Sequence, residues 1–389
     1  MERIRFRSER RTIPAPSAQS GPDGRVDPAC GPPGAARGEN ALMSESSGAP
    51  PKAAGRVTLV DVARHAGVST AAASKVIRNA AGVSEDMRAR VSASIAELSY
   101  RPRKSARALR GSTYSVGLVL GDIENPFNAL LLEGARSVLD LEGYDVLISP
   151  AGVDAAKQQH MADLLMDHDV DGLILVSPRF SEEQLEALAS TIPIVVIGRH
   201  GPGLNYDTVA GDDARGSELV VDHLVRLGHE TIAFVSNLRS DDPPTLPDVL
   251  RRRGFEASMT IRDLERSMRI IEAAWSVQGG HDAGSQLLTD TGVTAVHAGS
   301  DVVALGLNST LHSAGFAVPE HLSLVGHDNS PVASLAPFSL TSVDQQGHLM
   351  GQHASKMLLE RIAGRRAPQD ILLEPTLRVR GSTGQARAR

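Results

Sequence analysis

The chain has 389 residues, which is too long for one typical hydrophobic core and long enough for two or three domains. Its 41% hydrophobic and 22% charged residues are typical of a soluble globular protein, and a single cysteine, Cys30, excludes a disulfide framework and a thiolate metal site. No apolar run reaches membrane-spanning length, and the N-terminal sequence lacks the apolar core of a secretion signal. These features predict a cytoplasmic protein with no membrane partner.

The net charge of -6 conceals an uneven distribution. Residues 56–110 contain 11 Lys or Arg against 4 Asp or Glu, a net of +7, whereas residues 112–389 contain 21 against 36, a net of -15. A small basic module on an acidic body is typical of a nucleic-acid-binding protein, because its phosphate contacts are local. An accidental cluster of charge on a solvated face is the alternative interpretation.

Residues 1–55 are rich in Pro, Gly, Ala and Ser and show no hydrophobic periodicity, so a disordered tail is expected. Met1 and Met43 are both possible translation starts.

Between Thr58 and Tyr100 the pattern predicts three short helices. Thr58 and Asp61 resemble a capping box, and Gly67 is expected to end the first helix. Ser69 is a natural N-cap for a second helix over 70–78, and Ser84 is one for a third. Two short helices around a tight glycine turn are typical of a helix-turn-helix.

From residue 115 the pattern changes to short apolar strands alternating with helix-length segments. The first set is "VGLVL", "YDVLIS", "DGLILV" and "IPIVVIG"; a helix over 214–227 then opens a second set, "TIAFVS", "RIIEAA", "TAVHAG" and "LSLVG". This alternation predicts parallel α/β sheets in two lobes, with a ligand in the cleft between them.

The segments "TLVDVARHAGVSTAAASKVIRN", "VSEDMRARVSASIAELSYRPRKSARALRGSTYSVGLVLGDIENPF", "RRRGFEAS", "AGSDVVALGLNSTLHSAGFAVPEHLSLVGHDN" and "LTSVDQQGHLMG" occur in that order. Together they resemble the LacI/GalR family of bacterial regulators over about five sixths of the chain. The resemblance implies a disordered tail, an all-α helix-turn-helix domain, a hinge helix, a two-lobed α/β core like a periplasmic binding protein, and a flexible end. Their expected bounds are 1–55, 56–101, 102–112, 113–383 and 384–389.

The recognition helix of this family enters the major groove with its N-terminal residues at the base edges. The expected DNA contacts are Thr58, Ser69, Thr70, Ala71, Ser74, Lys75, Arg78, Asn79, Tyr100, Arg107 and Leu109. Lys75 stands where the family more often has arginine, so its contact is expected to be less specific or to move to a phosphate. Helix packing is the competing role for the alanines of "TAAAS".

The basic stretch "RPRKSARALRGS" is either a flexible linker or, by resemblance, a hinge helix that forms on DNA. In the second case Leu109 is the apolar wedge that enters a minor-groove step and bends the duplex.

For the cleft, the resemblance places a forked cation, an acidic group and an aromatic plate at positions 251, 301 and 275, an inventory suited to a sugar. The expected effector contacts are Asp122, Asn125, Phe127, Arg199, Arg251, Trp275, Asp301 and Gln345. Asp122 and Asn125 have a competing role in satisfying loop backbone, and His327 and Asp328 are interpreted as structural.

The expected function is that of a sequence-specific DNA-binding repressor of carbohydrate-utilisation genes, acting as a homodimer on a pseudo-palindromic operator and released or modulated by a small sugar. The alternatives are an activator or global regulator that senses a sugar phosphate or purine, or a sugar-binding protein of a transport system. An enzyme is not expected, because the first strand and helix lack a G-x-G-x-x-G turn and no nucleophile elbow is present. No metal, cofactor or catalytic residue is expected.

Overall fold

A computed structural model describes residues 57–77, 80–100, 112–201, 203–237, 242–290 and 292–387. The predicted tail 1–55, the hinge segment except Ser112, and four of the expected DNA contacts, Arg78, Asn79, Arg107 and Leu109, lie outside these residues.

The helix-turn-helix prediction is confirmed by three helices that pack on one another, α1 Leu59–His65, α2 Thr70–Ile77 and α3 Glu85–Glu97. Gly67 has a φ of +65°, the left-handed conformation that glycine adopts without strain, and it separates α1 from α2. The Ser69 hydroxyl accepts a hydrogen bond from the Ala72 amide at 3.1 Å, and Ser84 caps α3 in the same way. The caps predicted at these two serines are therefore present.

The first lobe is a parallel sheet in the order β11-β5-β4-β3-β1-β2. Helices α5 and α12 cover one face and α6 and α7 the other. The bounds are β1 Ser115–Leu120, α5 Phe127–Leu139, β2 Asp145–Pro150, α6 Ala155–Asp167, β3 Gly172–Val176, α7 Glu182–Ala189, β4 Ile194–Ile197, β5 Asp207–Gly211, α12 Gly347–Ile362 and β11 Asp370–Leu373.

The second lobe repeats this plan in the order β12-β10-β9-β8-β6-β7, in which β12 alone is antiparallel to its neighbour. Helices α8 and α9 cover one face and α10 and α11 the other. The bounds are α8 Asp213–Arg226, β6 Ile232–Ser236, α9 Pro247–Thr260, η1 Glu265–Ser267, β7 Met268–Glu272, α10 Val277–Leu287, β8 Ala295–Ala298, α11 Asp301–Ser313, β9 Ser323–His327, η2 Pro331–Ser334, β10 Thr341–Asp344 and β12 Thr376–Arg378.

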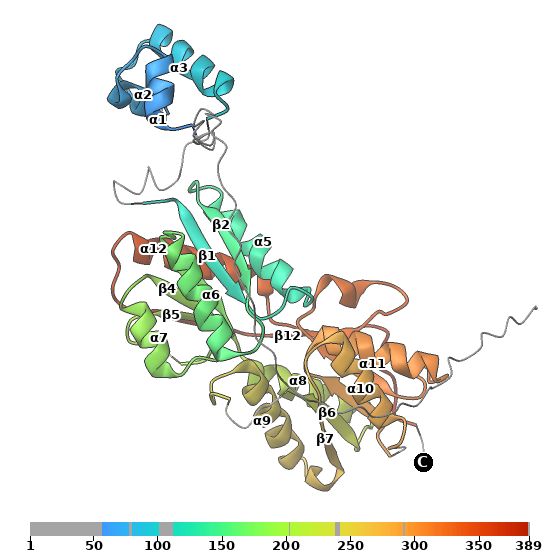
Figure 1. The fold of residues 1–389 in the computed structure, drawn as a ribbon. Helices are drawn as coiled ribbons and strands as arrows, with labels where there is room; N and C mark the ends of the chain where they lie inside the picture. Colours follow the sequence, from blue (N-terminus) through green and yellow to red (C-terminus); the bar gives the residue numbers. More distant parts are fainter. Residues whose placement is uncertain are drawn as a thin grey trace, which may run out of the picture. The chain divides into compact units, whose positions relative to one another are not determined.

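The chain passes between the lobes three times, after β5, after β10 and after β11. Figure 1 shows the consequence, since the red-brown α12 lies among the green elements of the first lobe. Helix α12 approaches α5 closely, because a Cβ on Gly134 would lie 2.0 Å from the His348 carbonyl oxygen. The two-lobe prediction is confirmed, but the lobes are not two successive halves of the sequence.

Residues 384–387 form part of the second lobe, although a flexible segment was expected from 384. The Ala386 amide donates to the Leu227 carbonyl at 2.8 Å, and Arg387 donates to the Glu320 carbonyl at 2.6 Å. One backbone contact and one contact from the Arg387 side chain thus attach the segment to the lobe.

Among the described residues, no helix is long and apolar enough to cross a membrane.

Candidate functional site

The N-terminal half of α2 presents an exposed surface. Thr70, Ala71 and Lys75 are exposed, whereas Ala73 and Val76 are buried against the other two helices. The packing role considered for the alanines therefore holds for Ala73. The two residues at the exposed start of α2 and the lysine one turn later are free to meet another molecule.

Two other predicted DNA contacts have structural roles in this domain. The Ser69 side chain is engaged as the cap of α2, and the Tyr100 side chain is only 8% exposed. Thr58 is exposed and Ser74 is half-buried.

A cavity of about 510 Å³ lies in the cleft and is lined by residues of both lobes. Such a volume is that of a small-molecule site. The polar and aromatic lining includes Asp122, Asn125, Phe127, Asn128, Gln158, Ser177, Arg179, Asn237, Asp248, Arg251, Trp275, Ser276, Ser300, Asp328 and Gln345. Most of these follow strands at their carboxyl ends, as expected for an α/β fold.

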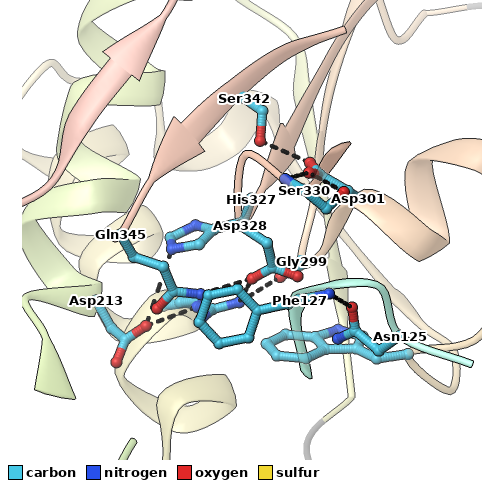
Figure 2. Close-up of polar contacts among 12 residues, drawn as sticks. Asn125, Phe127, Asp213, Gly299, Asp301, His327, Asp328, Ser330, Ser342 and Gln345 are labelled. Carbon is cyan, nitrogen blue, oxygen red and sulfur yellow. Dashed lines mark hydrogen bonds and ion pairs between the residues drawn. The ribbon is translucent and has the colours of Figure 1, made fainter. Parts of the chain in front are cut away.

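Six of the eight predicted effector contacts line this cavity, and Asp301 and Arg199 do not. Asp301 is fully buried at the start of α11, where it accepts hydrogen bonds from the Ser330 amide and hydroxyl at 2.7 and 2.8 Å and from the Ser342 hydroxyl at 2.6 Å. Figure 2 shows these three contacts turned away from Asn125 and Phe127. Burial raises the pKa of Asp301 to about 6, although these hydrogen bonds lower it. Asp301 therefore ties α11 to the loops beside it and lies outside the cavity lining, and its contact with an effector stays a prediction.

Arg199 is also buried, and its guanidinium is used inside the protein. It donates to the Phe180 carbonyl and, at 3.2 Å, to the Thr245 hydroxyl. Its side chain connects the loop after β4 to the segment before α9, outside the cavity.

Arg251 is a cation of the cavity lining that several contacts hold in place. Its Nε donates to Asp213 at 2.7 Å, its Nη1 donates to the Gly299 carbonyl at 2.7 Å, and Nη1 lies 3.6 Å from Asp328. Burial alone would raise the pKa of the Asp213 carboxyl, but Arg251 and a 2.8 Å hydrogen bond with His200 hold it below its usual value. The guanidinium is thus oriented before any ligand binds.

Trp275 presents its indole beside this arginine. The guanidinium carbon of Arg251 lies 5.0 Å from the ring centroid, and Nε1 donates to the Val235 carbonyl at 3.3 Å. A Cβ at position 299 would lie 2.4 Å from the ring, so Gly299 is what lets the indole occupy this place.

Asp328, interpreted from the sequence as structural, lines the cavity. Its Oδ1 accepts from the Gln345 amide at 2.6 Å, while Oδ2 is buried and has no hydrogen-bond partner. Burial raises its pKa to about 8 despite the opposing effect of Arg251. Its φ of 114° is unusual for a residue other than glycine, and such strain clusters at functional sites. The sequence signal for a cavity residue at this position is that Asp328 directly follows the end of β9.

Asp122 and Asn125 serve the loop backbone as well as the cavity. Asp122 accepts from the Glu124 amide at 2.7 Å and Asn125 from the Phe127 amide at 3.0 Å. The Asn125 side chain also hydrogen-bonds Asp328 of the other lobe. The two roles considered for these residues therefore coexist.

Sequence reasoning also missed an ion-pair group across the cleft. Arg179, in the loop after β3, donates to Asp248 at 2.8 Å and pairs with Asp242, and all three side chains are at most 10% exposed. Together with the contact between His200 and Asp213, this group joins the two lobes.

Among the described residues, no group of three or more His, Cys, Asp or Glu side chains could hold a metal ion.

Comparison with known proteins gives two family matches. Residues 58–103 match the model described as bacterial regulatory proteins, lacI family, and residues 221–383 match the periplasmic binding protein-like domain.

Individual relatives extend the similarity over most of the chain. It is 33% identical to the HTH-type transcriptional regulator DegA of Bacillus subtilis (strain 168) over 336 residues, which cover 84% of this chain and 98% of that protein. A lac repressor dimer bound to operator and the anti-inducer ONPF has a TM-score of 0.69 at 26% identity, covering 84% of this chain and 99% of the other. The transcriptional regulator CelR in complex with cellobiose has a TM-score of 0.61 at 28% identity, with 84% and 100% covered. The chain belongs to the LacI family of bacterial regulatory proteins.

Proposed function

We propose that this protein is a sequence-specific DNA-binding repressor of carbohydrate-utilisation genes whose operator affinity is controlled by a small sugar. The observation that carries the proposal is the presence, in one chain, of a lacI-family helix-turn-helix domain and a 510 Å³ cavity with Arg251, Asp328 and Trp275 in its lining. Operator binding by the lac repressor dimer and cellobiose binding by CelR, two similar structures, support the two halves of this function.

The DNA-binding half consists of the domain over 56–101 and the hinge over 102–112. Thr70, Ala71 and Lys75 face the base edges, because they occupy the exposed start of α2 and the turn after it. The remaining predicted residues contact the DNA backbone, except Leu109, which enters the minor groove. Their proposed set is Thr58, Ser69, Ser74, Arg78, Asn79, Tyr100, Arg107 and Leu109.

The sensing half is the core over 113–383, which also forms the homodimer. Its cavity favours a neutral saccharide over a phosphorylated metabolite. Two carboxylates, Asp122 and Asp248, line it beside the Asp328 carboxyl, whose pKa burial raises to about 8, and both arginines of the lining, Arg179 and Arg251, are already paired with aspartates. A phosphate would compete with these carboxylates, whereas sugar hydroxyls can both donate to and accept from them.

The effector acts by changing how the lobes close. Contacts that cross the cleft, Arg179 with Asp248 and His200 with Asp213, are made by side chains on both sides of the cavity. A ligand that binds one lobe arrangement better than the other shifts the population toward it and so changes operator affinity.

The test is a melting-temperature screen of the full chain against mono- and disaccharides, sugar phosphates and purines. Trp275 is the chain's single tryptophan and lines the cavity, so its fluorescence reports binding independently. We expect a neutral saccharide to raise the melting temperature and change the emission. Stabilisation by sugar phosphates or purines alone, or chemical conversion of the sugar, would contradict the proposal.

A further inference from the structure

The core begins with a hydrogen-bond knot centred on one carboxylate. Asp171 accepts at Oδ1 from the Thr113 amide at 2.8 Å, and this oxygen lies 3.0 Å from the Thr113 hydroxyl. Its Oδ2 accepts from the Tyr114 amide at 2.8 Å and from the Ser112 hydroxyl. One side chain thus receives three hydrogen bonds from three consecutive residues, which we name the Asp171 knot.

Other contacts fix the same three residues. The Thr113 hydroxyl also donates to the Asp169 carbonyl at 2.6 Å, and Thr113 is 3% exposed. Tyr114 has a φ of 52°, a conformation that a bulky residue adopts only when its surroundings impose it. The knot therefore sets the direction in which the chain enters the core.

The position of the knot along the sheet connects it to the cavity. Asp171 directly precedes β3, and residues 112–114 precede β1, its parallel neighbour. At the opposite ends of these strands the cavity is lined by Val176, the last residue of β3, by Ser177 after it, and by Gly121 and Asp122 after β1. The five residues of β3 span about 17 Å, so two adjacent, fully hydrogen-bonded strands join cavity and knot.

Residues 101–111 are the covalent connection between the helix-turn-helix domain and Ser112. Any change of lobe 1 that reaches the DNA-binding half through the chain therefore passes through residues 112–114.

We infer that Asp171 is a positioning residue for operator binding, which holds the end of the hinge segment in register with β3 and so couples the cavity to the DNA-binding domain. The inference rests on the proposed function and adds to it a residue that touches neither DNA nor effector. Replacing the carboxylate by an amide leaves one acceptor oxygen and turns an N–H toward at least one of the three donors. The hydrogen bonds to residue 171 then no longer fix the direction of the chain at residues 112–114.

The test compares the full-length wild type with Asp171→Asn and a matched control, Asp169→Asn. Asp169 is exposed, lies two residues away and contributes only its backbone carbonyl, so its substitution removes the same charge and leaves the three bonds to Asp171 in place. The probe is a labelled duplex selected from a random pool by the wild type. Readouts are affinity for this duplex, Trp275 emission, melting temperature, and amide exchange at Thr113 and Tyr114.

For Asp171→Asn we expect faster exchange at both amides and an affinity for the duplex lower by about ten-fold or more, with unchanged Trp275 emission. The control should match the wild type. A double variant, Ser112→Ala with Thr113→Val, removes the hydroxyl donors and should show a smaller loss in the same direction, which keeps the inference testable if Asp171→Asn does not fold.

Wild-type affinity in Asp171→Asn, equal losses in Asp169→Asn, or a loss that accompanies a changed Trp275 emission would each overturn the positioning role. A wild type that selects no duplex would instead overturn the proposed function.

Discussion

At the scale of single residues, two buried aspartates in the second lobe differ in how many of their carboxyl oxygens have hydrogen-bond partners. Asp301 has its hydrogen bonds filled by Ser330 and Ser342, whereas Asp328 retains one buried oxygen without a partner beside the cavity. Burial raises the pKa of both carboxyls. The first ties α11 to its neighbouring loops, and we propose that the second hydrogen-bonds a ligand hydroxyl.

Asp328→Asn tests this assignment through pH. A carboxyl whose pKa is about 8 in the folded protein and near 4 in the unfolded chain stabilises the fold below pH 4, and this stability is lost as the pH rises to 8. The variant lacks this loss, so its unfolding free energy relative to wild type should rise by about 2 kcal/mol or more between pH 5 and pH 8.5. Denaturant unfolding at both pH values measures it; a relative stability independent of pH would contradict the assignment. Sugar affinity should fall in the variant.

Gly299→Ala tests the position of the Trp275 indole without replacing Trp275 itself. The added Cβ would lie 2.4 Å from the Trp275 ring, so the ring must move and the stacking surface for a sugar is lost. We expect sugar affinity to fall by about 1 to 2 kcal/mol, as for Trp275→Ala, while Trp275→Phe loses less. Calorimetric titration with the saccharide found in the screen measures this. Equal affinity in all four proteins would show that the ring face is not used.

The candidate site could be predicted from sequence only in part. Six of the eight side chains predicted to contact the effector line the cavity, because strand-end positions in an α/β fold converge on the cleft. Asp301 lies outside the lining, because Ser330 and Ser342, from distant segments, hydrogen-bond its carboxylate, which the sequence does not reveal. The cross-lobe group of Arg179 was missed for the same reason, since its partners lie more than 60 residues away.

At the scale of elements, the exposed side of α2 is the part of the predicted DNA-binding surface that lies within the described residues of the recognition helix. Lys75→Ala should lower affinity for the selected duplex and reduce the salt slope by about 1 if Lys75 neutralises a phosphate. If it instead contacts a base, discrimination between the selected and a scrambled duplex falls. Anisotropy titrations at several salt concentrations distinguish the two, and wild-type behaviour in both respects would remove Lys75 from the interface.

The proposed hinge over residues 102–112 is the second element predicted to contact DNA, and Leu109→Ala tests it. Because the wedge contributes to the bent complex alone, this substitution should reduce DNA bending and operator affinity while sugar binding, followed by Trp275 fluorescence, stays intact. Circular-permutation gel shifts measure the bend. An unchanged bend would favour the flexible-linker interpretation.

Elements with strong periodicity or capping residues could be predicted from the sequence, as Ser69 and Ser84 show. Short strands could not. β5, β11 and β12 have three to five residues and are specified by pairing with distant strands, since β11 lies beside β5 across more than 150 residues of sequence. The interlaced lobes follow from that pairing, which local patterns do not encode.

At the scale of the whole molecule, the uneven distribution of charge agrees with the proposed assignment of DNA binding to residues 56–112 and of sugar sensing to the core. The net of +7 over residues 56–110 suits the proposed phosphate contacts, and the net of -15 over residues 112–389 belongs to the core for which we propose a neutral ligand. Two such basic modules in a dimer predict an operator affinity that falls steeply with salt.

The most direct test of the central claim is an anisotropy titration of the full-length protein on its selected duplex, at low and physiological salt, with and without the saccharide that stabilises it. We predict tight binding with a strongly negative salt slope, and a change in affinity on adding the sugar that is lost in Gly299→Ala. Affinity that is flat in salt, or identical with and without every saccharide that binds the cleft, would contradict the account of a sugar-controlled DNA-binding regulator.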